Sequence, residues 1–423
     1  GAIYPQMPAF DQPPCRAARY HDLGPQPENP QVVLAVVPAQ HLRSVLKEMP
    51  DFAGDLVICA KGIEQSTGAL MSDGYPMPDL PDGMGCFPGS KGQWIVVRNH
   101  EIHQGQAADH TLAYDPQRGG GVSRVVVDAK SGQRLSSNLL LTGTSRNCAG
   151  GPCTEGWLSC EEIDEPDHGY VFLCDPAADT LQPARRLPSL GRFPHEAAAF
   201  DPASGITYLT EDTADSAIYR HVPERSDQPF SAGTLQALKL VDTDRADLSA
   251  ERQVGDRLTV NWVTIDDPQA QSIPTRHQAQ ARGAAVLSRG EGMWSSPGVV
   301  YLASTDGGPA RRGQIYRLDI APPGEQDRLS LVAQAENDNA MANPDNLTIA
   351  PGGDVYIAED GSAPNLIWQL RSNGDIFPIA RNALSGEVKG LCFSPDGNWL
   401  FANLQKEGLT LAIRGPFNDR TPG

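Results

Sequence analysis

The sequence repeats one short pattern six times, and this repeat constrains the fold more than any other feature. Each copy starts with a small residue, usually glycine, continues as an aromatic and β-branched strand, and ends in polar or acidic residues. The copies lie at 92–101, 156–162, 205–212, 298–306, 353–360 and 397–405. Their aromatic residues are 43 to 93 residues apart. Propeller blades of four strands take about 40–50 residues, so the repeat predicts an all-β fold, a six-bladed β-propeller with insertions in some blades.

Composition agrees with many short strands joined by turns, because the 423 residues include 42 Gly and 36 Pro. We expect an N-terminal segment of uncertain structure over 1–66 and a single propeller domain over 67–423.

A second position recurs nine to twelve residues before each aromatic residue. It is filled by Asp82, Cys148, Glu196, Glu291, Asp345 and Lys389. A hairpin returns its second strand to the end where its first began, so this position and the acidic strand exit should meet on one rim. Five of the six blades would then direct a carboxylate or a thiol into one end of the central channel. Because crowded carboxylates repel one another unless a cation lies among them, we predict a metal site there. For Asp82, in PDGM, an ordinary turn is the alternative.

The charge balance limits the partners. The 52 acidic and 34 basic residues give a net charge of −18, which argues against nucleic acid. The surplus acids either keep the protein in solution or partly converge on bound cations. No apolar run reaches the roughly 18 residues that span a bilayer, so we expect no membrane insertion. Strong negative charge resists self-association, and we expect a monomer.

The eight cysteines contain no C-x-x-C pair, which argues against a zinc ribbon. If Cys148 serves the metal site, an odd number remains and not all can pair. One or two disulfides would suit an exported protein, and the pairing stays open. We expect a periplasmic or secreted protein whose export signal is not visible in this chain.

Six segments carry a family resemblance: NCAGGPCTEGWLSCEE, GRFPHEAAAFDPASGITYLTED, NWVTIDDP, SRGEGMW, NPDNLTIAPGGDVYIAEDG and FSPDGNWLFANLQ. They resemble the PhoX-type alkaline phosphatases, in their compact branch, over about 67–405. The resemblance implies a propeller with a mixed iron–calcium cluster (Fe3+ and Ca2+) in its channel. It also implies export of the folded protein by the twin-arginine route, and hydrolysis of small phosphate esters under phosphate starvation.

The resemblance also implies site residues. The metal ligands that it implies are Cys148, Glu162, Glu196, Glu291 and Asp345, together with the rim pair Asn99 and Glu101, and with Glu359 and Asn346 as further candidates. A thiolate suits iron, and carboxylates suit calcium. The loop before Glu161 is about one residue shorter than the family's, so Glu161 is an alternative to Glu162.

Arg289 matches the family's substrate arginine, whose fork of donors fits two phosphate oxygens. Its alternative role is a charge partner for neighbouring acids. With Arg289 and Cys148 as the catalytic residues, cations rather than a side-chain nucleophile would perform the chemistry. The expected substrates are phosphate monoesters, with diesters as a further class.

Residues 30–68 resemble a strand–helix–strand piece of glycerol-3-phosphate dehydrogenase. No G-x-G-x-x-G phosphate turn precedes it and about 40 residues cannot form a dinucleotide fold, so no dehydrogenase activity follows. We interpret this stretch as an atypical N-terminal insert or an error in the sequence.

Two other functions remain open for such a fold. One is a calcium-bound propeller that binds a partner without catalysis, and the other is a calcium-dependent propeller lactonase. Cys148 and Arg289 favour the phosphatase, because a thiolate is a poor ligand for calcium.

Overall fold

The computed structural model describes residues 69–250, 252–336, 341–361, 365–382, 386–415 and 417, together with the backbone of three earlier strands, 32–36, 55–59 and 62–65. Over these residues the fold is all-β, as predicted. The helical elements there are two short ones, the 3-10 helix η2 (Pro188–Leu190) and the α-helix α2 (Thr275–Ala281).

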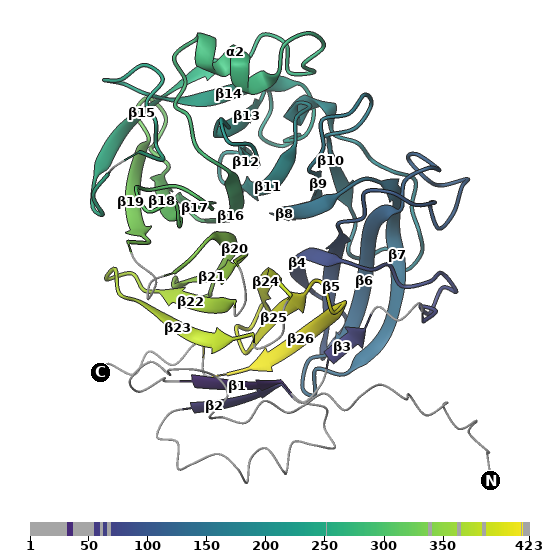
Figure 1. Cartoon of the computed structure of the whole chain (residues 1–423). Coiled ribbons are helices and arrows are strands. Elements are labelled where there is room, and N and C mark those ends of the chain that lie inside the picture. The colour runs from purple at the N-terminus through teal and green to yellow at the C-terminus, as the bar shows by residue number, and fades with distance from the viewer. Residues whose placement is uncertain are drawn as a thin grey trace, which may run out of the picture.

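The chain runs through successive antiparallel sheets that follow one another around a ring (Figure 1). The first sheet contains β4 (Pro81–Pro88), β5 (Gln93–His100), β6 (Gly120–Asp128) and β7 (Arg134–Thr144). The second contains β8 (Asn147–Cys153), β9 (Gly156–Glu161) and β10 (Val171–Cys174).

A nine-stranded sheet follows, in which two four-stranded sets are joined through one further strand. The first set is β11 (His195–Phe200), β12 (Thr207–Glu211), β13 (Tyr219–Pro223) and β14 (Gly233–Leu240). The second set is β16 (Gly290–Ser296), β17 (Val299–Ser304), β18 (Gln314–Asp319) and β19 (Arg328–Gln334). The joining strand β15 (Arg257–Thr264) pairs with β14 on one side and β19 on the other.

Two four-stranded sheets complete the ring. One contains β20 (Pro344–Ile349), β21 (Val355–Glu359), β22 (Leu366–Leu370) and β23 (Ile376–Arg381). The other contains β24 (Val388–Phe393), β25 (Trp399–Leu404), β26 (Leu409–Arg414) and, from the opposite end of the chain, β3 (Gly62–Gln65). The pairing of β3 with β26 covers an edge strand and joins an early strand of the described chain to its last one.

Within the 30–68 stretch, β1 (Val32–Val36) and β2 (Asp55–Cys59) form a parallel pair, in keeping with the two expected strands. The helix expected between them falls outside the described residues, as does most of the predicted segment 1–66.

The core lies between neighbouring sheets, and the aromatic residues of the repeat are part of it. Trp157 of β9 packs with Val97 of the preceding sheet, and Trp399 of β25 packs with Met84 of β4. Strand β11, HEAAAF, is covered on both faces, and all of its residues are buried. Its last four residues are apolar, whereas its first two are the buried polar residues His195 and Glu196.

The first strands of the successive sets line the inside of the ring. Each contacts the next, in the order β4, β8, β11, β16, β20, β24 and back to β4. These inner strands position the site described below.

Candidate metal centre

The second residue of every inner strand belongs to one set, which we call the inner ring. It consists of Asp82, Cys148, Glu196, Glu291, Asp345 and Lys389. In five of these strands the pairing register shifts immediately after the first residue, so the second residue lies in an irregular, bulged stretch. In β24 the shift follows Lys389 itself. Bulges redirect side chains away from the sheet, and here the same irregularity recurs around the ring.

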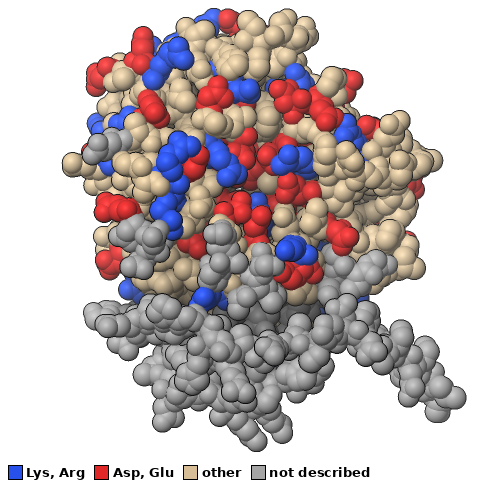
Figure 2. Space-filling model, viewed as in Figure 1, with Lys and Arg blue, Asp and Glu red and all other residues tan. Residues whose placement is uncertain are grey.

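Five of the six ring residues, all except Lys389, and two neighbouring carboxylates come together in three groups, each with ligand atoms within 4.8 Å of one another. The groups are Asp82 with Glu101 and Cys148, Cys148 with Glu162 and Glu196, and Glu196 with Glu291 and Asp345. Cys148 and Glu196 are each shared by two groups, so the three groups form one continuous cluster. Figure 2 shows acidic and basic side chains gathered at the centre of this face, over the inner strands.

Several oxygens of this cluster are buried without a hydrogen-bond partner. They include both carboxylate oxygens of Glu196, Oδ1 of Asp82 and Oδ1 of Asp345. Unpaired buried carboxylates are costly, because burial removes their water and nothing replaces it. A cation among these oxygens would offset that cost, so the donor set fits metal ions.

The pKa values of the cluster carboxylates also indicate a cation site. Burial raises the pKa of Glu196 well above its ordinary value, and the neighbouring Glu162 and Asp345 add to the shift. Burial also raises the pKa of Glu291, with Asp345 contributing further. These carboxylates therefore resist holding negative charge side by side without a cation.

Cys148 is 3% exposed and free. Burial raises the pKa of its thiol well above the ordinary value, and Asp82 and Glu196 raise it further. The surroundings thus provide no thiolate by themselves, and a coordinated metal ion is the agent that would deprotonate this sulfur. The other described cysteines, Cys86, Cys153, Cys160, Cys174 and Cys392, are also free.

The carboxylates at the strand exits reach the cluster one residue beyond the end of the second strand. Glu101 follows β5 and Glu162 follows β9. Arg146 bridges them, with its Nη2 3.1 Å from Oε1 of Glu101 and 2.8 Å from Oε2 of Glu162. Burial raises the pKa of Glu162 to about 7 despite this arginine.

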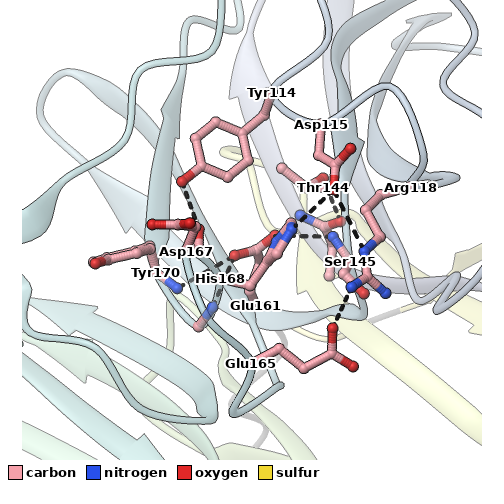
Figure 3. Close-up of polar contacts among 12 residues, drawn as sticks. Tyr114, Asp115, Arg118, Thr144, Ser145, Glu161, Glu165, Asp167, His168 and Tyr170 are labelled. Atoms are coloured by element: carbon pink, nitrogen blue, oxygen red, sulfur yellow. Dashed lines mark hydrogen bonds and ion pairs between the residues drawn. The ribbon is translucent and has the colours of Figure 1, made fainter. Parts of the chain in front are cut away.

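The neighbouring Glu161 points the other way, because successive side chains of a strand alternate between faces. Its Oε1 accepts hydrogen bonds from the Ser145 backbone N–H at 2.9 Å and from His168 at 2.8 Å. Its Oε2 accepts from the backbone of Gly169 at 3.0 Å, and Figure 3 shows this network beside Asp115. Of the predicted alternatives, Glu162 joins the cluster and Glu161 lies outside it.

Three other predicted residues form hydrogen bonds within the fold. Glu359, the last residue of β21, accepts hydrogen bonds from the Ala342 and Leu366 backbones and from Trp368. Asn99 donates to the carbonyls of Cys148 and Ala149, so it holds the bulge that carries Cys148. Asn346 accepts from the Leu391 backbone at 2.9 Å.

Arg289 stands at the edge of the cluster, immediately before β16. Its Nε and Nη2 each donate to Asp212 at 3.0 Å, and Nη2 also donates to Oε1 of Glu291 at 2.6 Å. Its backbone has a φ of +48°, a left-handed conformation that is uncommon outside glycine. With 35% of its side chain exposed, the guanidinium faces both the cluster and the solvent.

Two residues beside the cluster, Asp212 and Arg146, were not predicted from the sequence. Asp82 was predicted at the ring position, with an ordinary turn as the alternative. Asp212 could have been found from the exit rule, because it follows β12 as Glu162 follows β9. Lys389 was recognised at its ring position but not as a member of the site.

Comparisons with known proteins indicate the family to which the chain belongs. A family model described as "Alkaline phosphatase PhoX" matches residues 47–408. The structure of Pseudomonas fluorescens PhoX in complex with vanadate, a transition state analogue, aligns with a TM-score of 0.61 and 19% identity. The alignment covers 80% of this chain and 89% of that chain, and at this identity it shows the fold. A gluconolactonase from Xanthomonas campestris aligns with a TM-score of only 0.39.

The matching curated proteins are similar only over a short stretch. Glycerol-3-phosphate dehydrogenases of Erythrobacter litoralis and Novosphingobium aromaticivorans are 58% identical over 41 residues and 57% identical over 42 residues. Each match covers 10% of this chain, and the chain spans only 12% and 13% of the length of these dehydrogenases.

Proposed function

The chain belongs to the alkaline phosphatase PhoX family, and on that premise we propose that it hydrolyses phosphate monoesters at metal ions held by the inner ring. The observation that carries this proposal is the continuous cluster of buried donors around Glu196, whose two carboxylate oxygens have no other partner.

We assign the ligands from this cluster. Cys148 and Glu162 would hold iron, because a thiolate is a soft donor, while Glu196, Glu291 and Asp345 would hold calcium through hard oxygens. Glu101 and Asp82 would complete the side next to Cys148. Bound cations would supply neutralisation of the phosphoryl oxygens and activation of the attacking water.

Arg289 would bind the phosphate. Asp212 and Glu291 use its Nε and Nη2, which leaves Nη1 for a phosphoryl oxygen beside the cluster. Because Asp212 and Glu291 hold the guanidinium in place, the arginine need not reorganise as charge develops on the phosphoryl group. This arrangement favours a substrate phosphate over the uncharged ring of a lactone.

We also propose a propeller of six blades, together with the predicted domain bounds, export and monomeric state. The six inner strands support counting the nine-stranded sheet as two blades joined by β15, within a propeller domain over 67–423. No helix among the described residues is long and apolar enough to cross a membrane. We propose an exported, monomeric enzyme that acts on small phosphate esters in the periplasm or outside the cell.

The test is hydrolysis of 4-nitrophenyl phosphate before and after metal removal by prolonged dialysis against a chelator, with the metal content measured. We expect activity to fall at least about 100-fold and to return on addition of iron and calcium together. A phosphate diester and a lactone serve as comparison substrates. Undiminished phosphatase activity in verified metal-free protein, or turnover of the lactone alone, would contradict the proposal.

A further inference from the structure

Lys389 is the one basic member of the inner ring. As the second residue of β24 it stands where the other five inner strands carry a carboxylate or a thiol. Its side chain is buried, with 6% of the residue exposed. A buried lysine needs close anionic partners, because its ammonium loses its water.

The partners of this ammonium come from both neighbouring inner strands. Its Nζ lies 2.8 Å from Oδ2 of Asp345 on β20 and 3.8 Å from Oδ2 of Asp82 on β4. Oε2 of Glu387 lies 3.5 Å away. A positive charge surrounded by three carboxylates in this way takes the kind of position that a metal ion would take elsewhere in the ring.

In each of the two neighbouring aspartates, Asp345 and Asp82, one carboxylate oxygen faces the lysine and the other does not. Oδ2 of Asp345 contacts Lys389, while its Oδ1 is buried and unpartnered. Oδ2 of Asp82 faces Lys389 and accepts a hydrogen bond from Gln405, while its Oδ1 is likewise unpartnered. In both residues one oxygen is therefore left for the cluster.

The three donor groups show the same division. They run from Asp82 through Cys148 and Glu196 to Asp345, and among the described residues none joins Asp345 directly to Asp82. That remaining sector of the ring is where the ammonium of Lys389 lies.

We propose that the Lys389 ammonium is a built-in cation that fills the sector between Asp345 and Asp82, and so excludes one divalent cation that this sector would otherwise bind. This inference rests on the proposed function, because it takes the inner ring to be a metal site. It assigns Lys389 the role of setting how many ions the cluster holds and which oxygens of Asp345 and Asp82 face them.

The experiment compares wild type, Lys389→Gln and Lys389→Arg. Each protein is loaded with iron and calcium and dialysed, and both metals are counted per chain by mass spectrometry. Glutamine removes the charge and adds an amide oxygen beside Asp345, Asp82 and Glu387, a donor set that suits calcium. We expect Lys389→Gln to gain about one calcium per chain with iron unchanged, and Lys389→Arg to match wild type. Lys389→Gln with the wild-type metal count would overturn the inference.

Folding is followed in parallel by thermal unfolding with and without calcium. A Lys389→Gln protein that folds only with calcium supports the inference, because calcium then replaces the ammonium. If this variant folds in neither condition, anomalous diffraction from metal-loaded wild-type crystals decides. Ions confined to the Oδ1 sides of Asp345 and Asp82 support the inference, and an ion between their Oδ2 atoms overturns it.

The two proposals fail differently. Wild-type protein that binds neither iron nor calcium contradicts the proposed function itself. A metal-loaded, active wild type beside a Lys389→Gln variant with an unchanged metal count contradicts only the role of Lys389.

Discussion

At the scale of single residues, Arg289 shows how firmly the site is held. Its left-handed backbone is fixed by a hydrogen bond from its N–H to the Thr213 carbonyl at 2.8 Å and by the Thr305 N–H donating to its carbonyl at 3.1 Å. Burial works to lower the pKa of Arg289, but Asp212 and Glu291 outweigh it and raise the pKa above its ordinary range. The side chain is thus a fixed, permanent charge.

Arg289→Ala should lower the turnover of 4-nitrophenyl phosphate by about 100- to 1000-fold, because one preorganised donor to the developing charge is lost. Iron and calcium content should match wild type, since no ligand is removed. Steady-state kinetics with metal analysis on the same preparation checks both. The variant Arg225→Ala, which removes an exposed arginine paired only with Asp227, is the matched control and should be fully active. Loss of metal from Arg289→Ala would mean that the arginine holds the cluster together.

His168 gives a residue-scale prediction for pH. It is 3% exposed and lies between Glu161 and Asp115, with nitrogen–oxygen distances of 2.8 and 3.4 Å (Figure 3). Burial alone would lower the pKa of His168, but the hydrogen bond to Glu161 outweighs it, so the pKa is raised in the folded protein. A raised pKa stabilises the fold fully below the unfolded value of about 6.5, and this stabilisation is lost as pH rises through the folded value.

His168→Gln should therefore reduce the free energy of unfolding by about 1.5–3 kcal/mol at pH 5.5, and by less at pH 9. Denaturant titrations of both proteins at the two pH values, at equal metal loading, measure this difference. An equal loss at both pH values would show that the protonated histidine contributes nothing.

Much of the candidate site could be predicted from the sequence. Cys148, Glu196, Glu291 and Asp345 were predicted from the repeat and lie in one cluster. Glu161 and Glu359, the last residues of β9 and β21, lie outside the three groups because side chains alternate along a strand. A shift of one residue reverses the direction of a side chain, and sequence patterns do not fix strand ends that finely.

At the scale of elements, three of the inner strands approach a neighbouring inner strand so closely that the residue after the ring position must be glycine. Gly292 follows Glu291 in β16, and a Cβ atom there would lie 2.5 Å from the Asp345 carbonyl oxygen and 2.8 Å from Cα of Asn346. Gly83, after Asp82, and Gly390, after Lys389, face the neighbouring inner strand in the same way. These three glycines therefore allow the close approach of the inner strands that carry the ring residues.

Gly292→Ala should destabilise the protein by about 1–3 kcal/mol, because the contacted atoms are backbone and cannot rotate away. It should also weaken calcium binding by moving Glu291 away from Asp345. Thermal unfolding and calcium titration measure the two effects. Gly361→Ala is the control, since its nearest contact would be an ordinary 3.4 Å to Asn365. Wild-type calcium affinity in Gly292→Ala would show that this close approach does not matter to the site.

The elements themselves could be predicted only in part. The repeated hairpins correspond to β4–β5, β8–β9, β11–β12, β16–β17, β20–β21 and β24–β25. The second sheet has three strands rather than the expected four, and β15 joins two sets into one sheet. Nothing in a local pattern reveals pairing between strands as distant in sequence as β15 and β19, or β3 and β26.

At the scale of the whole molecule, the ring brings together acids that lie far apart in the sequence. Asp82 belongs to β4 and Asp345 to β20, far apart in the sequence, yet both lie beside Lys389. Part of the net charge of −18 is thus concentrated at one point, where cations would neutralise it. The closed ring explains why the donors can converge although no single segment contains a complete metal motif.

We propose above all that iron is bound to the ring through the sulfur of Cys148. X-ray absorption spectroscopy at the iron edge tests this proposal most directly, with wild type and Cys148→Ala measured side by side. We expect a sulfur neighbour of iron in wild type, and in Cys148→Ala the loss of that neighbour together with iron and activity while the fold is kept. Iron surrounded only by oxygen and nitrogen in wild type, or an unchanged spectrum in the variant, would contradict it.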